Sequence, residues 1–174
     1  TLDLARLTML VYEYGKSFEI DGNQTIEKFL TESMENTIDM NETRKEAIKT
    51  LSENSPHGQV VKFVSDPKTD IQVGITISKI NKRITIVFRG SESKYDWYYD
   101  LSIMKKQLWD DVYVHSGFYN QLHINNVYEE LVETIKELLK ENPDYHICVT
   151  GHSLGAALST LFGYELSHEI DKKV

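Results

Sequence analysis

The sequence predicts an α/β fold, in which a mostly parallel sheet is flanked by helices. Three observations indicate this fold class. The 174 residues are 40% hydrophobic and 26% charged, values that are ordinary for one globular domain with a substantial core. Strand-like apolar runs alternate with helix-like segments in the later part of the chain, an order that favours parallel strands covered by helices. A glycine-flanked serine lies between the last of these strands and the last helix.

The first 58 residues are expected to form a helical segment. Apolar residues recur at helical spacing from Leu4 to Tyr14, which predicts an amphipathic first helix. Shorter helices are expected around residues 26–30 and 47–51, before Ser55-Pro56-His57-Gly58 breaks the helical pattern. We therefore treat residues 1–174 as a single domain, with an N-terminal helical segment (1–58) and a sheet region (59–174).

The sheet region is predicted to begin with three strands. Val60–Val64 has the composition of a strand and is followed by Asp66-Pro67. Apolar residues alternate strictly with others over residues 71–77, the period of a strand with one dominant apolar face. Asn81-Lys82 then gives a tight connection into Ile84–Phe88, which reads as a buried strand of a hairpin.

The remaining elements alternate between strand and helix. Val112–Val114 predicts another short strand, and a long helix is expected from Phe118 to Leu139, ended by Asn142-Pro143. The strand Tyr145–Thr150 and a helix from Ser153 complete the pattern. Because the connections are short, this order predicts the parallel part of the sheet.

Composition excludes some classes of partner. The formal net charge is −8, and no local cluster of Lys and Arg offsets it, so a nucleic-acid partner is not expected. The single cysteine, Cys148, rules out an internal disulfide. No apolar run reaches the roughly 18 residues of a membrane span, and no signal peptide is visible. The compartment is therefore open, with a slight preference for the interior of the cell.

Gly151-His152-Ser153-Leu154-Gly155 has the order that a nucleophile elbow needs. In such an elbow a strained strand-to-helix turn exposes the serine hydroxyl, and side chains in place of the glycines would collide with the neighbouring strand and helix. A serine hydroxyl also needs a base, usually a histidine oriented by a carboxylate. We predict that Ser153 is a catalytic nucleophile; the alternative is a tight turn whose serine caps the helix.

A second candidate part of an active site is the end of a strand, Val87-Phe88-Arg89-Gly90-Ser91. A glycine followed by a hydroxyl residue could present a backbone N–H and the side chain of Ser91 to an oxyanion. The other donor would be the backbone N–H of Leu154, directly after the nucleophile. A strand followed by Gly-Ser is also common in ordinary turns.

Four short motifs follow one another along the chain: Arg89-Gly90-Ser91, Asp96-Trp97-Tyr98-Tyr99-Asp100-Leu101, His115-Ser116-Gly117-Phe118 and Gly151-His152-Ser153-Leu154-Gly155-Ala156-Ala157-Leu158. Together they resemble the motifs of the class 3 (fungal lipase-like) triacylglycerol lipases, and they are most similar to plant- and protist-type members, which include phospholipase A1 enzymes. The resemblance implies an α/β-hydrolase fold and hydrolysis of lipid esters through an acyl-enzyme, without a metal or cofactor.

The resemblance also implies roles for individual residues. It makes Ser153 the nucleophile, and Ser91 with the Leu154 amide the oxyanion hole. It gives His152 a structural place, pointing away from the reaction. His115 would likewise support the fold, and Arg89 would form an ion pair with Asp100.

The family carries a lid in the segment after Ser91. Here Trp97, Leu101, Met104 and Leu108 share helical spacing among further aromatic residues. Such a segment could cover the site in water and open on a lipid surface, such as a membrane or a lipid droplet. The alternative is a helix packed permanently on the sheet.

The acid and the base of a triad are not evident after the nucleophile. The family order is serine, aspartate, histidine, whereas only His168 and Asp171 follow Ser153, in inverted order. At about 1.5 Å per helical residue, His168 would lie roughly 20 Å from Ser153.

Three explanations of the missing acid and base remain open. We favour a chain that is the N-terminal part of a lipase, with the missing Asp and His elsewhere, for example on a second chain. The second explanation is an inactive descendant that binds lipid or a partner protein. The third takes the acid and base from within the chain, such as His115 with Asp110 or Asp111.

Overall fold

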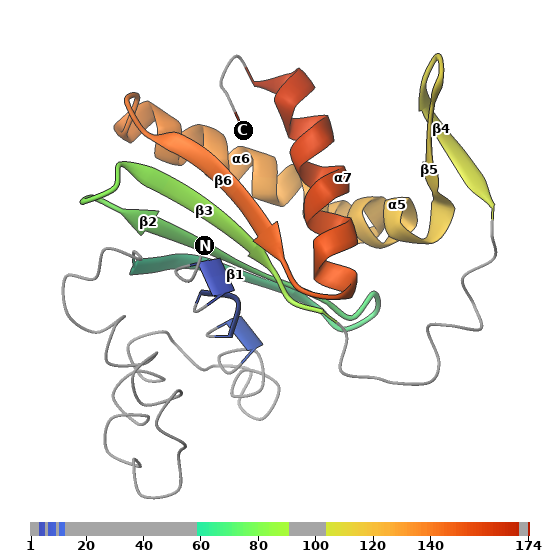
Figure 1. The fold of residues 1–174 in the computed structure, drawn as a ribbon, viewed down its shortest axis with the longest axis horizontal. Helices are drawn as coiled ribbons and strands as arrows, with labels where there is room; N and C mark the ends of the chain where they lie inside the picture. The colour runs from blue at the N-terminus through green and yellow to red at the C-terminus, as the bar shows by residue number, and fades with distance from the viewer. Residues whose placement is uncertain (1–3, 6, 10, 13–58, 91–103, 171–173) are drawn as a thin grey trace, which may run out of the picture.

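A computed structural model describes residues 4–5, 7–9, 11–12, 59–90, 104–170 and 174 of the chain (Figure 1). Strands β1 (Gln59–Asp66), β2 (Ile71–Ser78), β3 (Arg83–Phe88) and β6 (His146–Gly151) form the main sheet in the order β1-β2-β3-β6. Helices α5 (Ser116–His123), α6 (Val127–Glu141) and α7 (Leu154–Glu169) pack on it. The predicted α/β fold class is confirmed.

The direction of each strand follows from the length of its connection. β1 with β2 and β2 with β3 are antiparallel pairs joined by short turns. β3 and β6 are parallel, and the chain between them passes through α5 and α6, as a parallel crossover requires. The sheet is therefore mixed over the described strands. The strand predicted at 112–114 forms, but it pairs in a separate antiparallel hairpin and does not join the parallel part of the main sheet.

The central strands are buried on both faces of the sheet. Ile71, Val73 and Ile75 of β2 contribute to the main core, which lies between the sheet and α5–α7. The prediction of one dominant apolar face is thus correct, but the intervening residues of β2 are buried as well. The reason is that helical residues between Leu4 and Tyr12 cover the opposite face, where Leu7 and Val11 pack with Val87 of β3.

The N-terminal helix is confirmed at the residues that the structure describes. The helices expected near residues 26–30 and 47–51 lie outside the described residues, and the division of the domain at residue 58 stays a prediction. Val11 comes so close to the sheet that a Cβ on Gly74 would lie 2.7 Å from its Cγ2. Glycine at this position therefore lets the N-terminal helix approach β2 directly.

The long helix predicted from Phe118 to Leu139 is wrong in its middle. The 3₁₀ turn η2 (Ile124–Asn126) separates α5 from α6. Asn125 and Asn126 adopt left-handed conformations, with φ values of 67° and 60°, which asparagine tolerates better than most residues. The Asn125 amide also donates to Asp66 Oδ2 at 2.7 Å, so a contact with β1 fixes the break.

The predicted helical stripe through Met104 and Leu108 is also wrong. Residues Lys105–Trp109 form strand β4, which pairs with β5 (Val112–His115) in a separate hairpin. Figure 1 shows this hairpin extending from the body of the fold beyond α5. Antiparallel pairing with β5 overrides the helical spacing here. Trp97 and Leu101, the other residues of the predicted stripe, lie outside the described residues.

No described helix is long and apolar enough to cross a membrane.

Candidate active site

Ser153 lies in a sharp turn between the end of β6 and the start of α7. Its backbone has φ 56° and ψ −125°, a conformation that costs a residue with a side chain about 1–3 kcal/mol and persists only where the surroundings hold it. The strained strand-to-helix turn predicted from the sequence is therefore present. Strain of this kind, concentrated on one serine, is typical of a nucleophile elbow.

The two flanking glycines are required by close backbone contacts. A Cβ on Gly151 would collide with the carbonyl of Gly155 and lie 2.9 Å from the Ala156 nitrogen. A Cβ on Gly155 would collide with the Phe88 carbonyl oxygen and lie 2.9 Å from the Arg89 carbonyl carbon. Because these neighbours are backbone atoms, they cannot rotate away. The turn thus fits tightly against its own helix and against the end of β3.

Gly90 brings the end of β3 directly to the serine. A Cβ on Gly90 would lie 3.1 Å from the Ser153 Cβ and 2.7 Å from the His152 carbonyl oxygen. Ser91, the predicted oxyanion-hole residue, comes next in the chain and lies outside the described residues. Its role in an oxyanion hole stays a prediction.

Leu154 is the first residue of α7, as the predicted role of its amide requires. The next two amides, of Gly155 and Ala156, donate to the carbonyls of His152 and Ser153 at 2.9 Å. The first N–H groups of a helix carry partial positive charge and stabilise nearby anions. The role of the Leu154 amide in an oxyanion hole stays a prediction.

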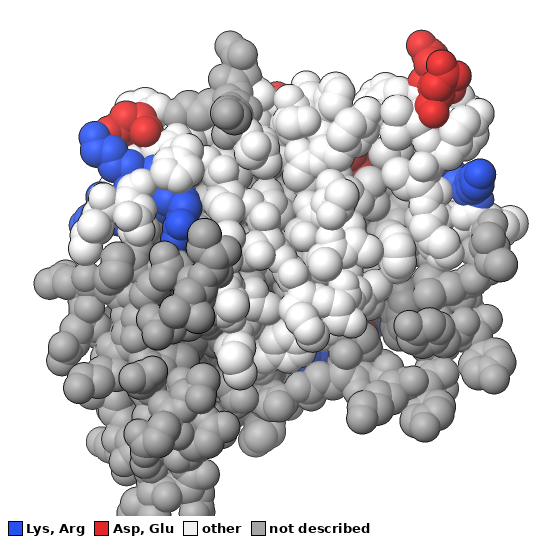
Figure 2. All heavy atoms as spheres, viewed as in Figure 1, with Lys and Arg blue, Asp and Glu red and all other residues white. Residues whose placement is uncertain are grey.

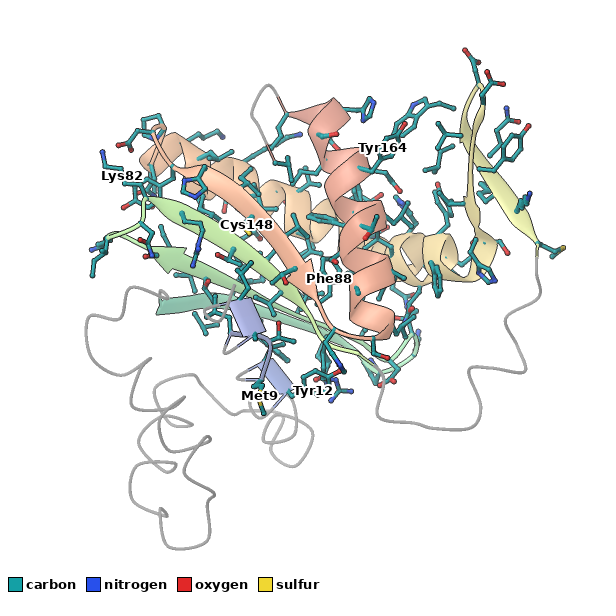
Figure 3. All side chains as sticks on the ribbon, in the orientation of Figure 1. Met9, Tyr12, Lys82, Phe88, Cys148 and Tyr164 are labelled. Atoms are coloured by element: carbon teal, nitrogen blue, oxygen red, sulfur yellow. The ribbon has the colours of Figure 1, made fainter. Side chains whose placement is uncertain are left out.

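Tyr12 connects the N-terminal helix to both strand ends. The backbone N–H of Gly90 donates to the Tyr12 hydroxyl oxygen at 2.9 Å, and the same oxygen lies 3.3 Å from His152 Nδ1. Figure 3 shows Tyr12 beneath the ends of β3 and β6. The His152 ring thus contacts the N-terminal helix. Sequence reasoning missed Tyr12, because a tyrosine beside an apolar stripe carries no signal of a site contact.

The two histidines considered as bases have other contacts. His115 caps α5: its Nδ1 accepts the Gly117 N–H at 3.1 Å. His168 is in the last turn of α7, where its ring stacks on Trp109 with centroids 4.7 Å apart. In the part of the chain that the structure describes, no histidine hydrogen bonds to the Ser153 hydroxyl. His115 and His168 thus have contacts other than the nucleophile.

Arg89 is held by a carboxylate that the sequence did not suggest. Its side chain is buried, and Nη2 lies 3.2 Å from Asp70 Oδ1. The predicted partner, Asp100, lies outside the described residues. The ion pair with Asp70 ties the end of β3 to the turn between β1 and β2.

A polar cluster connects the helices on the main-core side of the sheet. His123 Nε2 of α5 lies 2.9 Å from Glu165 Oε2 of α7. The Tyr128 hydroxyl and the Lys136 ammonium, both on α6, donate to Glu169 at 2.9 and 2.6 Å. The Lys136 hydrogen bond lowers the pKa of Glu169, and burial raises the pKa of Tyr128. These contacts anchor α7 far along the helix from Ser153.

Comparison with known proteins identifies the family of this chain. The family model described as Lipase (class 3) matches residues 85–173, which include β3, β6 and the Ser153 turn. The secreted mono- and diacylglycerol lipase A of Penicillium cyclopium is 32% identical over 106 residues, covering 60% of this chain and 34% of the relative. The chain thus spans about a third of the length of this relative.

Solved structures of lipases match part of this chain. The crystal structure of a triacylglycerol lipase from Penicillium expansum matches with a TM-score of 0.60 and 27% identity, over 66% of this chain and 47% of that one. A triacylglycerol lipase whose catalytic centre is formed by a serine protease triad matches with a TM-score of 0.59 and 31% identity, over 72% of this chain and 45% of that one.

Proposed function

Since this chain belongs to the class 3 lipase family and has the α/β-hydrolase fold, we propose that the protein containing it is a serine hydrolase that cleaves carboxylic esters of lipids. Its substrates would be triacylglycerols or the acyl esters of phospholipids. The observation that carries the proposal is the strained backbone of Ser153, held against the end of β3.

In the proposed reaction, Ser153 Oγ attacks the ester carbonyl carbon while a base accepts the hydroxyl proton. The resulting oxyanion is stabilised by the Leu154 amide and by Ser91. The bond to the leaving alcohol then breaks, and the alcohol takes the proton. Water attacks the acyl-enzyme in the same way and releases the fatty acid.

The acid and base of the triad would come from residues beyond those placed near Ser153. The edge of strand β6 suggests where the segment that carries the acid and base would pack. Among the described strands it pairs only with β3, and residues 147–150 of β6 carry no charged side chain, although free sheet edges usually carry charge or are covered. Figure 2 shows a largely uncharged surface over β6 and α7. A further segment or a second chain pairing with β6 would bring the missing Asp and His near the turn.

The segment after Ser91 would act as a lid, with Trp97, Leu101 and Met104 contacting lipid. Met104, the described member, is 65% exposed, and it leads directly into the projecting β4–β5 hairpin. Replacing Trp97 with Ala should then reduce hydrolysis of an emulsified ester more than that of a dissolved one. Equal reductions would argue for a helix packed permanently on the sheet.

Hydrolysis by the natural protein tests the proposed function. We expect release of fatty acid from a tributyrin emulsion or from phosphatidylcholine vesicles, and of p-nitrophenol from its butyrate ester. Ser153→Ala should lower these rates at least about a thousandfold, the scale seen when a catalytic serine is removed.

Ser159→Ala is the matched control on the same helix, because the exposed Ser159 hydroxyl only donates to the Ala156 carbonyl at 2.9 Å. It should retain full activity. If the natural protein hydrolyses none of the three esters, the alternative of a non-catalytic lipid- or protein-binding function is favoured instead.

A further inference from the structure

We propose that Tyr12 is a positioning residue for the reaction at Ser153, and that its hydroxyl fixes the end of β3 relative to the end of β6. This inference rests on the proposed function. Tyr12 would act through the two strand ends and would not touch the reacting atoms.

The pairing of β3 with β6 stops just before the residues of the site. β3 and β6 pair in parallel from Arg83 with His146 to Phe88 with Gly151. The residues on which the chemistry depends follow immediately after this last pair, so the ladder does not extend to them. Their relative position must be set by other contacts.

The Tyr12 hydroxyl supplies such a contact just beyond the last paired residue of each strand. It accepts the Gly90 N–H at 2.9 Å and lies 3.3 Å from His152 Nδ1. Gly90 follows β3 by two residues and His152 directly follows β6. One oxygen atom thus bridges the two chain segments that meet at Ser153.

The bridge is compatible with either tautomer of the neutral histidine. A phenol hydroxyl has one donor and two acceptor lone pairs. When His152 Nδ1 is unprotonated, Tyr12 donates to it and accepts from Gly90. When Nδ1 carries a proton, the Tyr12 oxygen accepts from both groups.

Tyr12 is itself held in place by the packing of its helix. The preceding residue, Val11, is 3% exposed and packs with Leu7 and Val87. Thr8 Oγ1 donates to the Leu4 carbonyl at 2.9 Å within the same helix. The phenol therefore projects from an anchored helix, which makes it a fixed point of contact for the two strand ends.

Small displacements at this point matter for catalysis. A Cβ on Gly90 would lie only 3.1 Å from the Ser153 Cβ, so a shift of the β3 end changes the surroundings of the nucleophile. A misplacement of about 1 Å can cost about a hundredfold in rate. Loss of the bridge should thus reduce the chemical step and leave substrate binding nearly unchanged.

The test is Tyr12→Phe in the natural protein, which removes only the hydroxyl. With p-nitrophenyl butyrate we expect kcat to fall about ten- to a hundredfold, with KM changed less than about twofold. The rate constant for labelling of Ser153 by a fluorophosphonate should fall by the same factor as kcat.

Tyr128→Phe is the matched control. It also removes one tyrosine hydroxyl, which donates to Glu169 at 2.9 Å between α6 and α7. We expect its melting temperature to fall by a similar amount to that of Tyr12→Phe, while its kcat stays at the wild-type value.

A second variant keeps the inference testable if Tyr12→Phe folds poorly. His152→Leu removes the other end of the bridge, and we expect a smaller loss of kcat. If the bridge acts as one unit, the double variant should lose no more than the more damaging single variant. Independent, additive losses would contradict the bridge. An unchanged kcat in folded His152→Leu would also contradict it, and this result needs no measurement on Tyr12→Phe.

The outcomes separate this inference from the proposed function. No labelling of the wild-type protein would overturn the proposed function. Wild-type labelling with an unaltered rate in Tyr12→Phe would overturn the role of Tyr12 alone. A raised KM with unchanged kcat would also overturn it, because Tyr12 would then form part of the substrate-binding surface.

Discussion

At the scale of single residues, the turn around Ser153 depends on two glycines, whose lack of a side chain lets the backbone pack closely. The sequence alone predicted this part of the site, since two glycines around a serine suit only a tight turn. The glycine contacts with the backbone at Phe88 and Gly155 bear this out. Tyr12 and Asp70 could not be predicted, because their contacts depend on how distant segments pack.

Gly155→Ala tests whether the turn needs this close approach. The added Cβ would collide with the Phe88 carbonyl oxygen, so we expect a loss of about 1–3 kcal/mol in the free energy of unfolding. Chemical denaturation measures this.

Gly163→Ala is the control on the same helix, because its Cβ would meet Val149 and Val174 at ordinary distances of 3.7 and 3.8 Å. It should be neutral or stabilise by up to about 1 kcal/mol through helix propensity. Equal effects of the two substitutions would show that the approach of α7 to β3 is not tight.

At the scale of elements, local pattern predicted the strands well and the helix between β5 and β6 less well. The strands of the main sheet follow from apolar runs with clear ends. The break at Asn125 and Asn126 depends on a bond to Asp66 of β1, and the helical spacing at Leu108 is overridden by pairing of β4 with β5. Contacts distant in sequence decided both cases.

Asn126→Ala tests the break between α5 and α6. Asn126 has φ 60° and makes no side-chain capping bond, so its main contribution is tolerance of the left-handed conformation. Alanine should cost about 1 kcal/mol in the free energy of unfolding, whereas Asn126→Gly should cost little. If alanine were stabilising, a continuous helix through this position would be the better description.

The contact between α6 and α7 should make stability depend on pH. The Lys136 hydrogen bond lowers the pKa of Glu169 in the folded state, so the unfolded state binds protons more readily in acid. The stabilisation is therefore present above the ordinary glutamate pKa of about 4.3, and it is lost as the pH falls through the lowered folded value.

Lys136→Met should accordingly lower the melting temperature at pH 7. The difference in melting temperature from wild type should shrink as the pH falls below about 4. Lys140→Met makes the same charge change on the same helix and is the control. If the difference in melting temperature between wild type and Lys136→Met did not change with pH, the hydrogen bond from Lys136 to Glu169 would not account for the pH dependence of stability.

At the scale of the whole molecule, the fold brings three distant segments to one point. The N-terminal helix, the end of β3 and the turn after β6 meet around Tyr12, Gly90 and Ser153. The order of motifs predicted the last two of these segments. It could not place the acid and the base of the triad, because only His168 and Asp171 follow Ser153 and their order is inverted. In the structure, no described histidine hydrogen bonds to the Ser153 hydroxyl.

The central claim is that Ser153 is an activated nucleophile in the natural protein. The most direct measurement is labelling with a fluorophosphonate, followed by mass spectrometry of the labelled peptide. We predict one label, on Ser153, that is lost after heat denaturation and in Ser153→Ala. A natural protein that stays unlabelled, or that is labelled at another residue, would contradict the claim.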